Sequence, residues 1–246
     1  QMIDTLLAQT YGNWELCIAN GSPDDEQMKQ VLAEYTQRDS RIRVQELKEN
    51  LGIAGNTNAA LAMTEGEFAG ILDHDDLLAP NALYEIALAL EKDPELDAVY
   101  TDEDKVTTDL SEHFQPHLKP DFNLDLLRSN NYICHFFVAR QSVIRKAGGF
   151  RQEFDGAQDH DFIFRCIEAV SPEEICHVPK ILYHWRCHMN SVAANPESKT
   201  YAYEAGCRAI QEHYRRVGIE AEVEMTKHPG WYRSHVKIQG EPLVSI

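Results

Sequence analysis

The chain has 246 residues, a formal net charge of -17 and a pI near 5.0, and its length suits one α/β domain with a sizeable core. The acidic balance argues against a nucleic-acid partner, because binding a phosphate backbone normally needs a basic face. No apolar run approaches the roughly 20 residues of a membrane helix, and the 6 cysteines form no C-x-x-C pair, which argues against a structural zinc site.

Strands and helices are predicted to alternate over the first hundred residues. Short apolar runs favour strands, and apolar residues spaced three and four apart favour helices. Such alternation is typical of an α/β, Rossmann-like fold with a mostly parallel central sheet and helices on both faces. The expected strands cover residues 14–19, 41–45, 68–72 and 98–101, and the expected helices cover residues 2–8, 26–37, 54–63 and 80–92.

The second half of the chain is less regular. Residues 110–128 contain Pro116 and Pro120 and predict a long loop, which is often functional. The further expected strands cover residues 132–138, 175–178 and 181–183, and the further expected helices cover residues 141–147, a segment that opens at 156–161, and 197–217.

Residues 68–76, with the sequence Phe-Ala-Gly-Ile-Leu-Asp-His-Asp-Asp, are the most informative segment. A buried strand runs directly into Asp73, Asp75 and Asp76, and like charges this close together repel each other. A bound cation would explain the arrangement. A solvated turn before a helix N-terminus, whose dipole favours carboxylates, would explain it equally well, so this segment by itself leaves both interpretations open.

Polar side chains follow three of the predicted strands. They are Asn20 and Ser22, then residues 73–76, then the acids at 102–104. In sheets of parallel strands, ligands bind beyond the carboxyl ends of the strands, so these side chains should line one pocket. Their convergence favours a metal-assisted nucleotide site over a solvated turn.

A second polar segment, Gly-Ala-Gln-Asp-His-Asp at 156–161, opens a predicted helix. Asp161 is best explained as a carboxylate that complements the helix dipole. Asp159 lies beside a glycine-bearing loop and is the better candidate for chemistry. The strand at 181–183 leads to His184, although a single histidine is usually not a ligand.

The order of these motifs resembles family 2 glycosyltransferases of the GT-A fold, of the bacterial polysaccharide or rhamnan assembly type. The resemblance covers nearly the whole chain. It rests on the following segments: Asn-Gly-Ser at 20–22, Asn-Leu-Gly at 50–52, Asp-His-Asp-Asp at 73–76, Tyr-Thr-Asp-Glu-Asp at 100–104, Asp-Gly-Ala-Gln-Asp at 155–159 and Tyr-His-Trp-Arg at 183–186.

The resemblance implies roles for individual residues. Asp159 would be the catalytic base. The residues expected to bind the nucleotide sugar are Asn20, Ser22, Asn58, Asp73, Asp75 and Arg186, and His188 is a further source of positive charge. The residues expected to bind the metal are Asp75 and His184, and Asp73 is an additional candidate. The chain departs from the family at Ala19-Asn20, where an acidic pair is usual, at Thr57, where arginine is common, and at Gln158, where glutamate is common.

The implied reaction moves a sugar, with inversion, from a nucleotide-diphosphate donor to a hydroxyl of a glycan or lipid-linked oligosaccharide. Mn²⁺ or Mg²⁺ is the expected cofactor, and a histidine ligand favours Mn²⁺. We expect a cytoplasmic protein without a transmembrane segment. A peripheral position at the inner face of the membrane is also compatible with the resemblance.

Members of the family begin with a strand of the Val-Ser-Ile-Val-Ile-Pro type, and this sequence starts after it. We therefore expect residues 1–240 to form one GT-A domain that lacks its first strand, with an open slot in the sheet. Residues 241–246 resemble the start of a following, tandem glycosyltransferase domain. Their strand would alternatively fill the slot, in the same chain or in a domain-swapped homodimer.

Two other functions are compatible with the sequence. The first is a catalytically inactive domain that binds glycan or holds a tandem partner, which Ala19-Asn20 and the missing strand favour. The second is a phosphatase with an Asp-x-Asp motif, which Leu77 disfavours because a hydroxyl residue is normal at that point.

Overall fold

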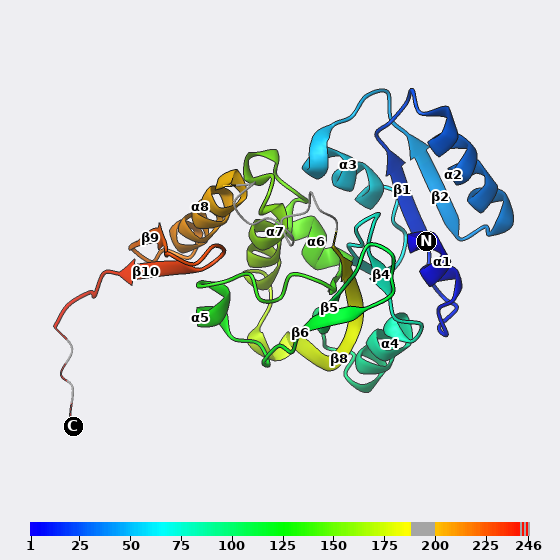
Figure 1. The fold of residues 1–246 in the computed structure, drawn as a ribbon. Coiled ribbons are helices and arrows are strands. Elements are labelled where there is room, and N and C mark those ends of the chain that lie inside the picture. The colour runs from blue at the N-terminus through cyan, green and yellow to red at the C-terminus, as the bar shows by residue number, and fades with distance from the viewer. Residues whose placement is uncertain (188–199, 242, 244, 246) are drawn as a thin grey trace.

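The computed structural model describes residues 1–187, 200–241, 243 and 245. It has the expected α/β class, with helices on both sides of a central sheet (Figure 1). The helices are α1 (Met2–Leu7), α2 (Glu26–Arg38), α3 (Gly52–Leu61), α4 (Ala82–Lys92), α5 (Leu124–Leu127), α6 (Gln141–Ala147), α7 (Gln158–Ile167) and α8 (Thr200–Arg216). The strands are β1 (Leu16–Asn20), β2 (Ile42–Glu46), β3 (Phe68–Gly70), β4 (Leu77–Leu78), β5 (Ala98–Val106), β6 (His113–His117), β7 (Phe137–Arg140), β8 (Ile175–Arg186), β9 (Ala221–Met225) and β10 (Tyr232–Val236).

The central sheet is mixed, so the prediction of a mostly parallel sheet is wrong. Its strands follow the order β3-β7-β5-β8-β4, and β6 pairs with β5. The pair β1–β2 is parallel, as the alternation in the first hundred residues predicts, and the pair β5–β8 is parallel as well. However, β7 lies between β3 and β5 and runs antiparallel to both. Strands β3 and β5, both from the first half of the chain, are therefore separated in the sheet by a strand from the second half.

A break separates β1 and β2 from the larger sheet within the described residues. The segments that lead into β1 and β3 nevertheless meet, because the Glu15 carboxylate accepts the backbone N–H groups of Glu65 and Gly66 at 2.6 and 2.7 Å. Leu16 of β1 and Phe68 of β3 pack against the same buried cluster. The unpaired edges of β1 and β3 thus belong to segments that lie next to each other.

The expected filling of a slot by residues 243–246 stays a prediction. Residues 242, 244 and 246 lie outside the described residues, and Leu243 is 95% exposed. The predicted helix at 197–217 is described from Thr200 onwards, as α8.

Strand β5 is longer than predicted, because the acids at 102–104 lie inside it rather than beyond its end. All three are buried, and each has a histidine partner. The predicted loop at 110–128 contains β6 and α5. Ionic partners from distant segments offset the cost of burying these charges, and no local pattern in the sequence reveals such partners.

Strand β5 divides the core into two parts. Ala98 and Tyr100 face a cluster with α6, α7 and α8, whereas Val99 faces a cluster with α4. This alternation is the period of two expected for a strand that is buried on both faces. In the part of the chain that the structure describes, no helix is both long and apolar enough to cross a bilayer.

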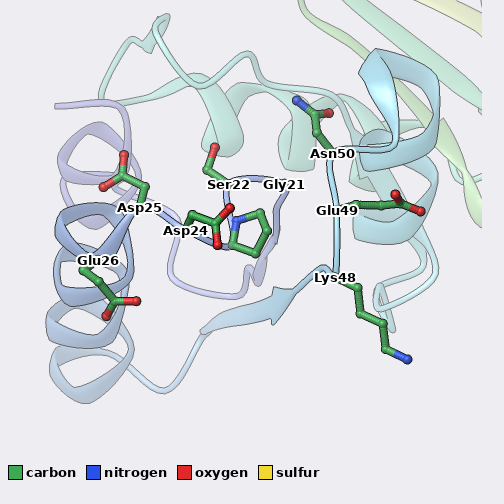
Figure 2. Close-up of a pocket in the computed structure, with 9 residues that line it drawn as sticks. Gly21, Ser22, Asp24, Asp25, Glu26, Lys48, Glu49 and Asn50 are labelled. Carbon is green, nitrogen blue, oxygen red and sulfur yellow. The ribbon is translucent and has the colours of Figure 1, made fainter.

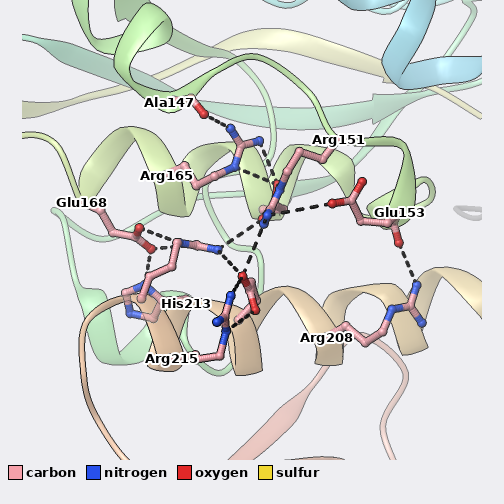
Figure 3. Close-up of polar contacts among 11 residues, drawn as sticks. Ala147, Arg151, Glu153, Arg165, Glu168, Arg208, His213 and Arg215 are labelled. Carbon is pink, nitrogen blue, oxygen red and sulfur yellow. Dashed lines mark hydrogen bonds and ion pairs between the residues drawn. The ribbon is translucent and has the colours of Figure 1, made fainter.

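An ion-pair network ties α7 to its neighbours (Figure 3). Asp161 is 0% exposed and accepts hydrogen bonds from Arg151 and from Arg165, whose Nη2 lies 2.8 Å from Oδ2. Glu168 pairs with His213 Nδ1 of α8 at 2.7 Å. Burial raises the pKa of Asp161, but the two guanidinium groups outweigh it and hold the pKa below its usual value. Asp161 is therefore a structural carboxylate.

Asp161→Asn is expected to lower the free energy of unfolding by about 3–5 kcal/mol, because Arg151 and Arg165 lose their buried partner. The melting temperature should fall by roughly 10 °C in a chain of this size. Since the folded-state pKa lies below the unfolded value, this stabilisation is complete above about pH 4 and is lost as the pH falls further. Thermal unfolding measured from neutral to acid pH tests the effect. The difference in melting temperature between the parent and the variant should disappear at acid pH.

Asp125→Asn is the matched control. The Asp125 side chain is 92% exposed and lies 3.3 Å from Arg128, so its loss should cost less than about 1 kcal/mol. Equal melting temperatures for the two variants would contradict the structural role of Asp161.

Candidate functional site

The acidic segment after β3 is held in place by its last residue. Asp76 is 1% exposed, and its carboxylate accepts hydrogen bonds from the Tyr183 hydroxyl and from the Arg186 N–H at 2.8 Å. Burial raises the pKa of Asp76 to about 6, although these two donors oppose the shift. The side chain of Asp73 is 56% exposed and that of Asp75 is 36% exposed, so both can meet a ligand.

The predicted base, Asp159, lies in the first turn of α7 and is half-buried. Its Oδ2 accepts a hydrogen bond from Asn131 Nδ2 at 2.7 Å and lies 3.8 Å from Cys134 Sγ. The preceding Gly156 has φ +99°, a conformation that side chains rarely adopt, and a Cβ there would meet Ala202 at 3.0 Å. The glycine therefore allows the close turn that brings Asp159 to this position.

His135 connects the two acidic segments. Its Nε2 lies 3.8 Å from Asp73 Oδ2, and its ring stacks on Tyr183 with centroids 4.7 Å apart. The adjacent Cys134 contacts Asp159. Asp73 and Asp159 are far apart in sequence, yet one dipeptide touches both of them. The structure therefore brings the predicted metal motif and the predicted base into one site.

A buried charged pair, Glu103 and Lys119, holds the segment that contains His135. Glu103 Oε2 accepts the His135 N–H at 3.2 Å, and Lys119, whose side chain is 0% exposed, lies 3.5 Å from the same carboxylate. Lys119 Nζ also donates to the Ile133 carbonyl at 2.7 Å. Burial raises the pKa of Glu103, but His117, His135 and Lys119 outweigh it and hold the pKa well below its usual value. Glu103 is therefore the buried anion that fixes the His135 segment.

Sequence reasoning did not identify Asn131, Cys134, His135 or Lys119. The available signal was the acidic run at 102–104, because carboxylates inside a strand need cationic or hydrogen-bonding partners. Because the sequence pattern predicts that the strand ends before this run, it predicts acids that line a pocket, without such partners.

An open pocket of about 740 Å³ lies at the carboxyl ends of β1 and β2 (Figure 2). Its lining residues are Gly21, Ser22, Pro23, Asp24, Asp25, Glu26, Lys48, Glu49 and Asn50. Beside it, the buried Asn20 donates from Nδ2 to Glu46 Oε2 at 2.8 Å and accepts the Ser22 N–H at 3.0 Å. Lys48 is the single cation among the lining residues, so the pocket suits a ligand that offers N–H donors rather than phosphate.

The pocket and the predicted base are connected through the start of α3. The Ala54 N–H lies 3.3 Å from Asp155 Oδ1, in the loop that precedes Asp159. A Cβ on Gly52 would lie 3.5 Å from the other oxygen of Asp155. The first half of the chain thus contacts the loop that precedes the predicted base directly.

Asn58 is engaged with backbone. Its Nδ2 donates to the Phe150 carbonyl at 2.8 Å, and its Oδ1 accepts the Phe150 N–H at 2.7 Å. It also packs on Gly149, where a Cβ would come within 2.6 Å of Oδ1. Its predicted contact with the nucleotide sugar stays a prediction, since both ends of the amide already hold the turn at 148–150.

Asn58→Ala should lower the free energy of unfolding by about 1–3 kcal/mol, because it leaves the N–H and carbonyl of Phe150 without their partner. Nucleotide-sugar affinity should stay within about twofold of the parent value if the residue is purely structural. Thermal unfolding and calorimetric titration separate the two effects. Lost affinity at unchanged stability would instead establish Asn58 as a donor-binding residue.

His184 and Arg186 lie on β8, and their side chains point away from Asp73. Tyr183 and its neighbour His184 face opposite sides of the strand, and the Tyr183 hydroxyl contacts Asp76. His184 Nδ1 instead lies 2.6 Å from Asp104 Oδ1, and Arg186 Nε donates to the Thr108 carbonyl at 2.9 Å. His188 lies outside the described residues.

The donor set near Asp73 fits a divalent cation. Asp73, Asp76 and His135 offer ligand atoms within 4.8 Å of one another, with Asp75 adjacent in sequence. Carboxylate oxygens suit Mg²⁺ and Mn²⁺, and an imidazole favours Mn²⁺. Over the described residues, no group of three such ligands contains both Asp75 and His184, so their shared coordination of a metal stays a prediction.

Comparisons with known proteins agree with this geometry. A family model described as glycosyl transferase family 2 matches residues 1–148. Uncharacterized protein y4gI of Sinorhizobium fredii is 40% identical over 247 residues, which is 100% of this chain and 27% of that protein. O-antigen biosynthesis protein RfbC of Myxococcus xanthus is 37% identical over 246 residues, which is 100% of this chain and 19% of that protein. The chain therefore spans a minor part of the length of both relatives.

The solved structure of S. aureus TarS 1-349 in complex with UDP-GlcNAc is similar, with a TM-score of 0.67. The match covers 86% of this chain and 61% of that one, at 18% sequence identity. A likeness at this identity shows a shared fold.

Proposed function

Because the chain belongs to glycosyl transferase family 2, we propose that it forms the donor-binding and catalytic unit of an inverting glycosyltransferase. The donor would be a nucleotide-diphosphate sugar. The observation that supports this most is the bridge from Asp73 through the Cys134-His135 dipeptide to Asp159. In-line displacement at a sugar requires a cation site and a base close to each other, and this bridge supports the proposal that Asp73 and Asp159 belong to one site.

Asp159 is proposed to take the proton from the acceptor hydroxyl as that oxygen attacks the anomeric carbon. Within the described residues, its hydrogen bonds fall on Oδ2, where Asn131 fixes the orientation of the carboxylate. Oδ1 is then the oxygen that faces the acceptor. Attack from the side opposite the leaving nucleotide inverts the configuration of the sugar.

Asp75 is proposed to hold the divalent cation, with Asp73 beside it. The ion, when bound, would supply positive charge against the negative charge that develops on the leaving diphosphate. Asp76 contributes by anchoring the loop to β8 through Tyr183 and the Arg186 N–H. The exposed position of Asp73 and the partial exposure of Asp75 suit ligands that meet a large, charged substrate.

The pocket at the ends of β1 and β2 is proposed to receive the nucleobase. Its carboxylates accept hydrogen bonds from ring N–H groups and repel phosphate. Asn20 takes the place of an acidic residue of the family, and its hydrogen-bond partner Glu46 supplies a carboxylate next to it. Ser22 lines the pocket itself.

The acceptor is proposed to be a glycan or lipid-linked oligosaccharide hydroxyl, in line with the relative that is named for O-antigen biosynthesis. A panel of nucleotide sugars with Mn²⁺ or Mg²⁺, read by thermal stabilisation and by release of nucleoside diphosphate, tests the proposal. One donor should stabilise the protein and release its nucleotide when acceptor is present. Binding without release under all conditions would indicate an inactive binding domain, and release of inorganic phosphate without acceptor would indicate a phosphatase.

A further inference from the structure

Two histidines and one carboxylate converge on the side of β8 that faces away from Tyr183. His184 Nδ1 lies 2.6 Å from Asp104 Oδ1, and His113 Nδ1 lies 3.0 Å from Asp104 Oδ2. The two imidazole rings meet edge to face, with centroids 4.7 Å apart. The ligand atoms of all three residues lie within 4.8 Å of one another. The cluster joins β5, β6 and β8.

This cluster is separate from the site at Asp73. In the parallel pairing of β5 with β8, Asp104 is opposite His184 and Glu103 is opposite Tyr183. Successive side chains point to opposite faces of a sheet, so Glu103 and Tyr183 share the face of His135, and Asp104 and His184 share the other face. The contacts agree, because Glu103 and Tyr183 both touch His135.

We propose that Asp104, His113 and His184 form a second cation site, specific for a transition-metal ion of the Zn²⁺ type. Two imidazoles and a carboxylate are a ligand set that Zn²⁺ and its neighbours accept and that Mg²⁺ disfavours. Without an ion, the Nδ1–H groups donate to the Asp104 carboxylate. With an ion bound, each neutral imidazole would carry its proton on Nε2, which leaves the Nδ1 lone pair for the metal. The side chain of Asp104 is 10% exposed and that of His184 is 18% exposed, so these two ligands are largely preorganised.

The 52% exposed side chain of His113 closes the site from the solvent side. Because His113 lies in β6, a bound ion would tie the segment around β6 to the two long strands. This segment leads to Lys119, which supports His135. The second site would thus stabilise the framework of the first while taking no part in the chemistry. His184 would serve this site rather than the cation at Asp75.

Co²⁺ and Zn²⁺ binding to the chelator-treated protein tests the proposal, with millimolar Mg²⁺ present to occupy oxygen-rich sites. We expect one Co²⁺ per chain with visible absorption bands typical of imidazole ligation, and we expect Zn²⁺ to displace it. His113→Gln and Asp104→Asn should weaken binding at least 100-fold, since even a change beyond the ligands costs about 10- to 100-fold.

His235→Gln is the matched control, because His235 pairs with Glu224 at 3.1 Å without a second histidine. It should bind like the parent, and so should Asp75→Asn. Far-UV circular dichroism checks folding, and the partly exposed His113 keeps the test valid if Asp104→Asn unfolds. Absence of the cobalt bands in the parent, or parental binding by His113→Gln, would overturn the proposal.

Discussion

Asp159→Asn is expected to lower the rate of sugar transfer by about 10²- to 10⁴-fold, the contribution of general-base catalysis. Asparagine has nearly the same size and keeps an oxygen for the hydrogen bond from Asn131, which spans 2.7 Å in the parent. It cannot take a proton from the acceptor hydroxyl. Initial rates at saturating donor and acceptor measure the loss, and calorimetric titration should show nearly parental affinity for the nucleotide.

Glu153→Gln is the control for this variant. Glu153 lies shortly before Asp159, and its side chain is 64% exposed, so the change removes a nearby charge and no proton acceptor of the site. Its transfer rate should equal that of the parent. The assignment of Asp159 as the base fails if its Asn variant also transfers sugar at the parental rate.

The family and the GT-A fold were predictable from the sequence, and the roles of the two polar segments stay predictions. Asp73 and Asp159 follow local patterns that chemistry constrains: a buried strand that ends in acids, and a glycine turn that opens a helix. Patterns of this kind depend on neighbouring residues only. Such patterns are visible without the tertiary structure, whereas the contact of the two segments through Cys134 and His135 depends on it.

The mixed sheet and the acidic interior of β5 were not predictable in the same way. Strand β7 is inserted between β3 and β5 by pairing that no local pattern encodes. Likewise, Asp102 is buried because His177 lies 2.8 Å away and the Lys119 N–H donates to it at 2.9 Å. A run of acids predicts exposure unless its partners are known, and these partners come from other strands and loops.

His184 lies on the expected segment and has Asp104 as its hydrogen-bond partner, while its coordination of a metal together with Asp75 stays a prediction. Tyr-His-Trp-Arg lies on β8 close to the acidic segment, as the resemblance implies. Successive side chains of a strand, however, point to opposite faces of the sheet. Adjacent residues of β8 therefore belong to two different sites. Tyr183 meets Asp76, and His184 meets Asp104.

Asp75→Asn is expected to lower transfer by about 10²- to 10³-fold, comparable to the loss of one group that stabilises charge in a transition state. The loss should include the dependence on added Mn²⁺ or Mg²⁺, because the variant lacks the proposed anionic ligand for the cation. Rates measured across a titration of each metal, after treatment with chelator, provide the test.

Two controls separate this effect from the charge of the loop and from the second cation site. His74→Gln changes a side chain that is 92% exposed and adjacent to Asp75, and it should keep the metal dependence. His113→Gln should keep it too, since His113 belongs to the opposite face of the sheet. If Asp75→Asn retains a parental response to the metal while His113→Gln loses it, the catalytic cation lies at Asp104 and the proposed roles of the two sites are reversed.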